Sequence, residues 1–154
     1  MWQMGVWERD EGLAEQLAPL GQESTAFLRA GCHPAQLSGR VFDLLVVSPR
    51  AAGWAGAGAI ACRTALVPGG MACLTRLLPC DRAVSYGMGA ANTLTLSSCA
   101  EQRASVAIQR EFSSLNGLLV ERQELVLPYD GQPPELFLAW VGAALLLRGD
   151  VGLA

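Results

Sequence analysis

The residues best suited to hold a ligand come directly after three apolar segments of the chain. They are Ser48, Arg50, Gly69, Gly70, Tyr86 and Gly87. If the three segments are parallel strands, their carboxyl ends meet at one end of the sheet, where open α/β sheets bind ligands. We therefore expect these residues to line one crevice.

Two more polar residues complete this candidate set. Glycines at the start of a helix leave backbone N–H groups open for an anion, and Arg63 could supply the counter-charge. Asn92 follows the third segment and could add an amide. A simpler interpretation also stands, in which the glycines only shape the turns between strands and helices.

The cysteine and histidine residues do not indicate a nucleophilic or metal site. The five cysteines contain no CxxC pair, and the single histidine is His33. This set fits neither a zinc site nor a disulfide framework, so we expect small buried thiols and no metal or cofactor. His33 is expected at a helix-to-strand turn at the opposite end of the sheet, which argues against a Cys-His or Ser-His couple.

Other segments that resemble known sites depart from the required spacing. The stretch "GWAGAG" from Gly53 to Gly58 reads GxxGxG instead of GxGxxG, and the P-loop pattern is absent. We interpret it as a packed or flexible loop. Glu121, Glu124 and Asp43 are expected to be solvated, and Trp54 and Trp140 to be core or interface anchors.

The composition excludes further classes of function. The net charge of −3 and the pI near 5.1 argue against nucleic-acid binding, which needs a clustered positive field. The chain has no lysine, so it lacks a Schiff-base nucleophile and a phosphate-binding lysine. No signal-peptide pattern opens the chain, and the run 136–147 is shorter than the ~20 residues that span a bilayer. We expect a cytoplasmic protein without membrane contact.

Hydrophobic periodicity predicts alternating strands and helices up to Gly87. Strands are expected over 1–6, 42–49, 64–70 and 82–87. Helices are expected in "EGLAEQLAPL", ending at Pro19, in "ESTAFLRAG", and in "MACLTRLLP", while 51–63 is expected to be a loop leading into a short helix. This alternation is typical of a parallel α/β sheet with right-handed crossovers.

The pattern changes after residue 90. "NTLTLSS", "ASVAIQREF" and "LLVERQELVLP" predict antiparallel, half-exposed strands, and Asn116-Gly117 predicts a hairpin between the last two. "ELFLAWVGAALLLRG" predicts a closing helix from about Glu135 to Arg148. The whole chain, 1–154, is expected to be a single domain: a Rossmann-like three-layer sandwich whose parallel sheet is extended by antiparallel strands.

The stretch "AVSYGMGAANTLTLSS" resembles the end of the central, ATP-binding domain of Mur ligases, where a strand with a "TYG"-like motif precedes a loop and an alternating strand. "TALVPGG" stands where that family has the strand ending in its Asn-Asp-Asp-like turn. "LVLPYDGQPPELFLAWVGAALLLRG" stands where it has Leu-Pro-Gly, His-Asn and an alanine-rich helix. The resemblance covers roughly residues 42–149, and it extends to UDP-N-acetylmuramyl pentapeptide synthase-like proteins.

The departures from this family bear on activity. The ATP-binding loop with its lysine, the carbamylated metal-bridging lysine and the C-terminal domain have no counterpart. The family's His-Asn pair falls on Gln132 and Pro133, and its later asparagine near Glu135. Without phosphate positioning, magnesium and the incoming amine, ligation lacks its machinery, so we do not expect an active ligase.

Three functions follow as hypotheses. The leading one is a non-catalytic binding or regulatory module that recognises a nucleotide-sugar or a protein partner in cell-wall precursor metabolism. The second is a small enzyme or nucleotide-sugar-binding protein that uses the crevice, and a buried Cys62 would count against catalysis. The third is a structural homodimer, suggested by a closing helix that is apolar on every side.

Overall fold

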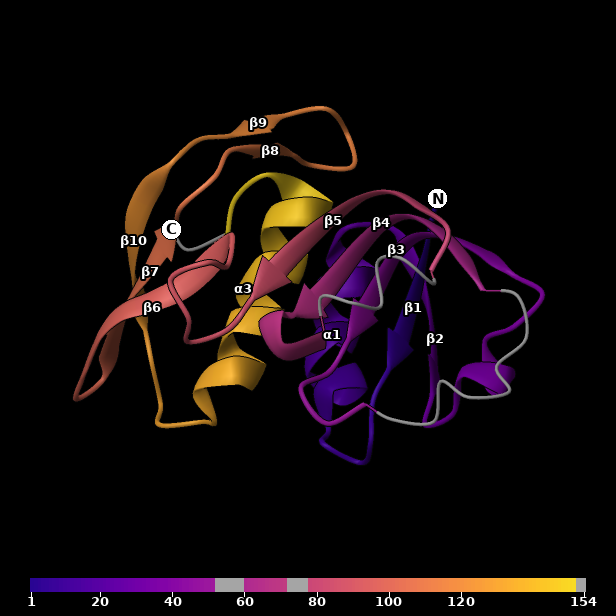
Figure 1. Ribbon diagram of the computed structural model, residues 1–154, viewed down its shortest axis with the longest axis horizontal. Helices are drawn as coiled ribbons and strands as arrows, with labels where there is room; N and C mark the ends of the chain where they lie inside the picture. Colours follow the sequence, from indigo (N-terminus) through magenta and orange to yellow (C-terminus); the bar gives the residue numbers. More distant parts are fainter. Residues whose placement is uncertain (52–59, 72–77, 152–154) are drawn as a thin grey trace.

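The computed structural model of the protein describes residues 1–51, 60–71 and 78–151. The described elements are β1 (Trp2–Trp7), α1 (Leu13–Glu23), β2 (Ala26–Gly31), η1 (Pro34–Gln36), β3 (Val41–Val47), β4 (Ala61–Pro68), η2 (Gly69–Met71), β5 (Cys80–Tyr86), β6 (Leu94–Ala100), β7 (Arg103–Ile108), β8 (Phe112–Ser113), β9 (Leu119–Val120), β10 (Gln123–Pro128) and α3 (Pro134–Arg148). Eight of the strands build one sheet with helices packed against it, and β8 and β9 form a separate two-stranded sheet (Figure 1).

The sheet has the order β10-β7-β6-β5-β4-β3-β1-β2. Strands β1 to β5 run parallel, and β6 joins β5 in parallel through the single pair Tyr86 and Leu94. Strands β7 and β10 then add antiparallel pairs. This confirms the predicted α/β class, with a parallel sheet extended by antiparallel strands after residue 90.

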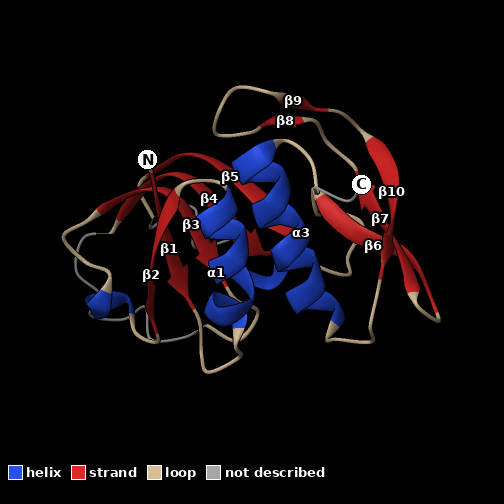
Figure 2. Ribbon diagram, turned by 180° about the vertical axis from the view of Figure 1, so that it is seen from behind, coloured by secondary structure: helices blue, strands red, loops and turns tan. Residues whose placement is uncertain are grey.

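The central strands form because their apolar residues are continuous. Residues 44–47 of β3 are all buried, as expected for a strand covered on both faces of a parallel sheet. Helices α1 and α3 lie side by side on one face (Figure 2). The other face has its own apolar cluster, which includes Trp7, Phe42 and Ile60.

The closing helix α3 confirms its prediction almost to the residue. It begins at Pro134 and ends at Arg148, and the next residue, Gly149, has a φ of 83°, a conformation that glycine adopts readily. At Gly142 the helix lies close to the sheet, because a Cβ there would be 2.9 Å from Leu66 and 3.0 Å from Leu94. At its end, Arg148 pairs with Glu23 of α1 at 2.7 Å.

Two helix predictions near the N-terminus are wrong. Pro19 does not end α1, which continues to Glu23 and only forgoes the hydrogen bond that the proline nitrogen cannot donate. The stretch "ESTAFLRAG" is not a helix, since Ala26–Gly31 forms the edge strand β2. Thr25 has a φ of 54°, which breaks the helix, and pairing with β1 outweighs the helical pattern of the short segment.

The segments on either side of β4 were predicted only in part. Residues 52–59 and 72–77, where a loop with a short helix and the "MACLTRLLP" helix were expected, lie outside the described residues. Ala61–Arg63 belongs to β4, which therefore starts three residues earlier than the sequence indicated. Gly69–Met71 forms a short 3-10 turn.

Asn116-Gly117 forms the expected turn but closes a smaller hairpin than predicted. It connects β8 and β9, which form a separate two-stranded sheet, while β10 pairs with β7 in the main sheet. The predicted strand "LLVERQELVLP" is divided at Glu121 and Arg122 between these two sheets.

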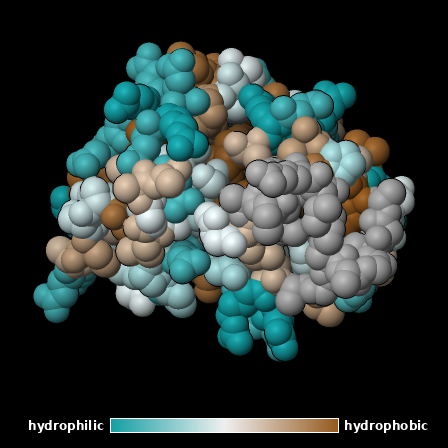
Figure 3. Space-filling view, viewed as in Figure 1, coloured by the Kyte–Doolittle hydropathy of each residue, from teal (hydrophilic) through white to brown (hydrophobic). Residues whose placement is uncertain are grey.

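Helix α3 does not present the apolar surface that suggested a homodimer. Eleven of its residues are buried, from Leu136 to Leu147. The large exposed hydrophobic residues are spread over other elements, and they are Met1, Phe27, Val41, Met88, Leu118, Leu119 and Val126. On the described part of the face in Figure 3, hydrophobic and hydrophilic residues alternate. Within the described residues, no helix has the length and apolarity needed to cross a membrane.

Candidate functional site

A crevice lies at the carboxyl ends of the parallel strands, as the topology predicts. It consists of two hollows of about 390 and 330 Å³ that share Glu135, in the first turn of α3. The larger hollow is lined by Asp10, Glu11, Pro49, Arg50, Pro133, Pro134, Glu135 and Leu136. The smaller is lined by Gly69, Gly70, Gly87, Met88, Gly89, Ala91, Asn92 and Glu135.

The structure brings most of the predicted site residues to this crevice. The residues that line it are Arg50, Gly69, Gly70, Gly87 and Asn92. Ser48 and Tyr86 lie beneath it, because both are fully buried. Arg63 is the one candidate that the structure places elsewhere.

Ser48 does not line the crevice, but it orients the carboxylate of Glu11, which does. Its hydroxyl donates a short hydrogen bond to Oε1 of Glu11. The backbone N–H groups of Arg9 and Arg50 donate to the two oxygens of the same carboxylate at 3.1 and 3.2 Å. These donors are neutral, so they orient the negative charge of Glu11 without cancelling it.

Tyr86 is part of the floor and does not offer a hydroxyl to a ligand. Its hydroxyl donates to the carbonyl oxygen of Val47. Burial raises the pKa of Tyr86 well above its ordinary value, and the charges of Glu11 and Glu135 raise it further. The residue is therefore neutral and structural.

Asn92 closes the smaller hollow by packing against glycines. A Cβ at residue 69 would lie 2.1 Å from Oδ1 of Asn92, and one at residue 87 would lie 3.0 Å from its Nδ2. The Asn92 amide nitrogen also donates to the carbonyl oxygen of Gly89 at 2.9 Å. Glycine is thus required at position 69 by the close approach of a side chain.

Arg63 lies at the opposite end of the sheet. Strand β4 begins level with the start of β3, because Ala61 pairs with Val41. Its third residue, Arg63, is therefore near the amino ends of the strands, where its Nε lies 4.0 Å from Oδ1 of Asp43. It cannot act as a counter-charge in the crevice.

The N-terminus of α1, where the first strand-to-helix turn could receive an anion, is already filled by the protein. The carboxylate of Glu8 accepts hydrogen bonds from the backbone N–H groups of Glu11, Leu13 and Ala14 at 3.1, 3.2 and 2.5 Å. Glu8 is buried, so this internal carboxylate satisfies the helix N-terminus. A phosphate would have to displace it.

The charge of the crevice is the feature that sequence reasoning missed. Asp10, Glu11 and Glu135 line it, while Arg50 is its one cationic side chain among the described lining residues. Asp10 and Glu11 follow the carboxyl end of β1. The rule that selected Ser48 and Gly69 would have found them if applied to the first strand.

The thiol and imidazole groups that the structure describes offer no nucleophilic couple at this crevice. Burial raises the pKa of Cys62 to about 12, with further contributions from the charges of Cys80 and Asp81. His33 follows β2, so it lies at the crevice end of the sheet and not at the opposite end as predicted. It is not among the crevice lining, and its Nδ1 accepts from the Ala35 N–H at 3.0 Å. Among the described residues, no group of three metal-ligating side chains occurs.

Comparison with models of known protein families, with curated proteins and with solved structures finds no match to this chain.

Proposed function

We propose that the chain is a non-catalytic binding module of cell-wall precursor metabolism, and that its crevice takes the amine-bearing peptide part of a precursor. The observation that carries this proposal is the surplus of carboxylates, three against one guanidinium, along the described lining of the crevice. Such a site attracts a cation and repels a diphosphate.

Two further features support a peptide ligand. The smaller hollow is lined mostly by glycines and by the amide of Asn92, whose neutral polar groups suit peptide bonds. The internal carboxylate of Glu8 fills the helix terminus at which a nucleotide would place its phosphates. The link to cell-wall precursors comes from the resemblance of residues 83–98 to Mur ligases.

Isothermal titration calorimetry with three probes tests the proposal. The probes are a muramyl peptide whose stem carries a free side-chain amine, the same peptide with that amine acetylated, and a UDP-sugar. We expect the free amine to bind most tightly, with an affinity that falls as salt screens the carboxylates. Tight binding of the UDP-sugar and none of the peptide would instead favour the nucleotide-sugar alternative.

A pair of variants localises the binding. Glu135→Gln removes one crevice charge and should weaken binding of the amine-bearing peptide about twofold to fivefold, the effect of a solvated charge pair of ~0.5–1 kcal/mol. Glu124→Gln, on the exposed edge strand β10, makes the same change of net charge away from the crevice. Equal affinities of the two variants would place the peptide elsewhere.

A further inference from the structure

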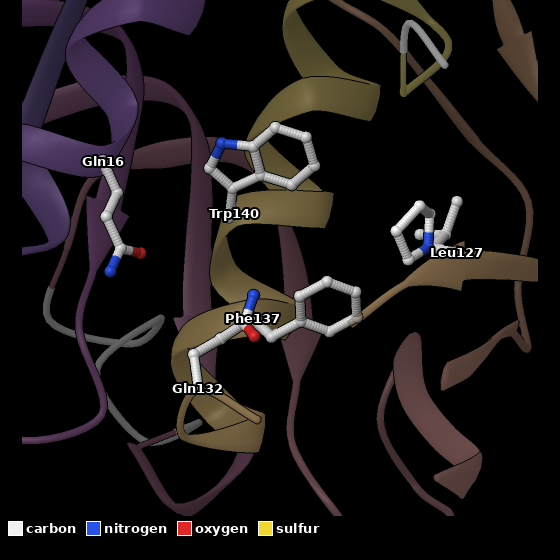
Figure 4. A pocket seen from close by; sticks show the side chains of 6 residues that line it. Gln16, Leu127, Gln132, Phe137 and Trp140 are labelled. Atoms are coloured by element: carbon white, nitrogen blue, oxygen red, sulfur yellow. The ribbon is translucent and has the colours of Figure 1, made fainter. Parts of the chain in front are cut away.

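A third hollow lies on the helical face of the sheet, between α1, α3 and the end of β10. It has a volume of about 330 Å³ and is lined by Gln16, Leu127, Pro128, Gln132, Phe137 and Trp140. Figure 4 shows Trp140 and Phe137 on neighbouring turns of α3, with Leu127 of β10 across the gap and Gln16 of α1 on the other side. None of these side chains is charged, so the hollow suits an uncharged ligand.

Several walls of this hollow are fixed before any ligand binds. The ring of Phe137 packs edge-on against Tyr129 with the centroids 5.1 Å apart. The Tyr129 hydroxyl donates to the backbone carbonyl of Gln132, and the Asp130 N–H donates to Oε1 of Gln132 at 2.9 Å. Preformed walls reduce the entropy that binding would cost.

On the α3 side of the hollow the polar groups left free are donors, while the Gln16 amide on the α1 side offers both a donor and an acceptor. The side-chain oxygen of Gln132 is occupied by Asp130, so its Nε2 remains to donate. The indole N–H of Trp140, which is half-buried, has no acceptor among the described residues. A half-buried indole N–H ordinarily finds a partner, which here would have to come from a ligand or from water.

We infer that this hollow binds an uncharged, planar ring compound that carries a carbonyl acceptor. The aromatic faces of Trp140 and Phe137 would take the ring, opposite Leu127 and Pro128. The Gln132 amide or the Trp140 indole N–H would donate to the carbonyl oxygen. A bicyclic lactam has this chemistry and a size that fits a small-molecule pocket.

The test is a nuclear magnetic resonance titration of the ¹⁵N-labelled protein that follows the Trp140 indole N–H, assigned with the variant Trp140→Phe. Three probes are used. Carbostyril is a bicyclic lactam, indole lacks the carbonyl acceptor, and naphthoate carries a charge. Carbostyril should shift the Trp140 signal. Indole should bind about tenfold more weakly, as expected for loss of the hydrogen bonds, and naphthoate should bind more weakly because its charge would lose water among uncharged side chains. An unmoved Trp140 signal, or equal binding of all three compounds, would overturn the inference.

A conservative variant separates the donor from the shape of the hollow. Gln132→Glu keeps the oxygen that accepts from Asp130 but removes the amide donor, and it should weaken carbostyril about tenfold. Gln22→Glu, at an exposed position of α1, makes the same charge change and should bind like the wild type. Wild-type affinity in Gln132→Glu contradicts the site. Glu135→Gln should not change carbostyril binding, because Glu135 lines the crevice and not this hollow. The two proposals can therefore fail independently of each other.

Discussion

The hydroxyl of Tyr86 donates a hydrogen bond to the carbonyl oxygen of Val47, although β4 separates their two strands. Both residues end their strands, and both are fully buried beneath the crevice. The bond ties three parallel strand ends together at the level where the ligand-binding loops begin. The stability of the crevice floor therefore depends on a side chain that is buried beneath the lining.

Tyr86→Phe should lower the free energy of unfolding by about 1–3 kcal/mol, because it leaves the buried Val47 carbonyl without its donor. Urea denaturation followed by circular dichroism measures the change. Tyr129→Phe is the matched control, because its hydroxyl donates to a carbonyl of Gln132 in a partly exposed loop that water can reach. A loss in Tyr129→Phe as large as in Tyr86→Phe would contradict the role assigned to the buried bond.

Gly69→Ala should destabilise the protein by about 1–3 kcal/mol, since the new Cβ would collide with the side chain of Asn92 at 2.1 Å. Gly70→Ala provides a neighbouring control, because a Cβ at residue 70 would meet nothing within 4 Å. Its effect should stay within about 0.5 kcal/mol. Thermal unfolding of both variants decides the matter, and equal melting temperatures would show that Asn92 moves aside at no cost.

Much of this architecture follows from local pattern, and the errors have physical causes. The apolar run 44–47 and the closing helix were predicted because burial on all sides leaves a continuous signal. "ESTAFLRAG" was misassigned because a six-residue edge strand gains its stability from pairing with β1, which no local pattern records.

The candidate site was predicted to the extent that strand direction determines it. Parallel strands bring Gly69 and Gly87, which directly follow β4 and β5, to one end of the sheet. The depth of Ser48 and Tyr86 could not be inferred, because it depends on which atoms lie above them. The prediction for Arg63 was wrong because β4 starts at Ala61. Arg63 is therefore near the amino end of the strand, far from the crevice at the carboxyl ends.

Glu8→Ala should lower the free energy of unfolding by about 1–2 kcal/mol, because three backbone N–H groups at the start of α1 lose their acceptor. Glu15→Ala removes an equal charge from the first turn of α1 itself, but Glu15 is exposed and accepts no such set of bonds. Chemical denaturation of the pair separates capping from the helix dipole. If the free energy of unfolding falls equally in both variants, the hydrogen bonds of Glu8 contribute nothing beyond its charge.

Cys62 should resist alkylation near neutral pH while the exposed Cys32 and Cys99 react. The thiolate is the reactive form, and burial raises the pKa of Cys62 to about 12. Treatment with iodoacetamide followed by peptide mass spectrometry reports each site. Rapid modification of Cys62 in the folded protein would show that its burial is transient.

The same raised pKa makes stability depend on pH in the alkaline range. Between the ordinary value of 9.0 and about 12, the unfolded chain loses the Cys62 proton while the folded chain keeps it. The unfolded state then binds fewer protons, so the free energy of unfolding falls as pH rises, by up to about 1.4 kcal/mol per pH unit from this group. Below pH 9 the thiol is protonated in both states and does not make stability depend on pH.

Cys62→Ala should therefore show a smaller fall in stability than the wild type when urea midpoints are compared from neutral to alkaline pH. Parallel curves would mean that the thiol ionises equally well in the folded and unfolded chain.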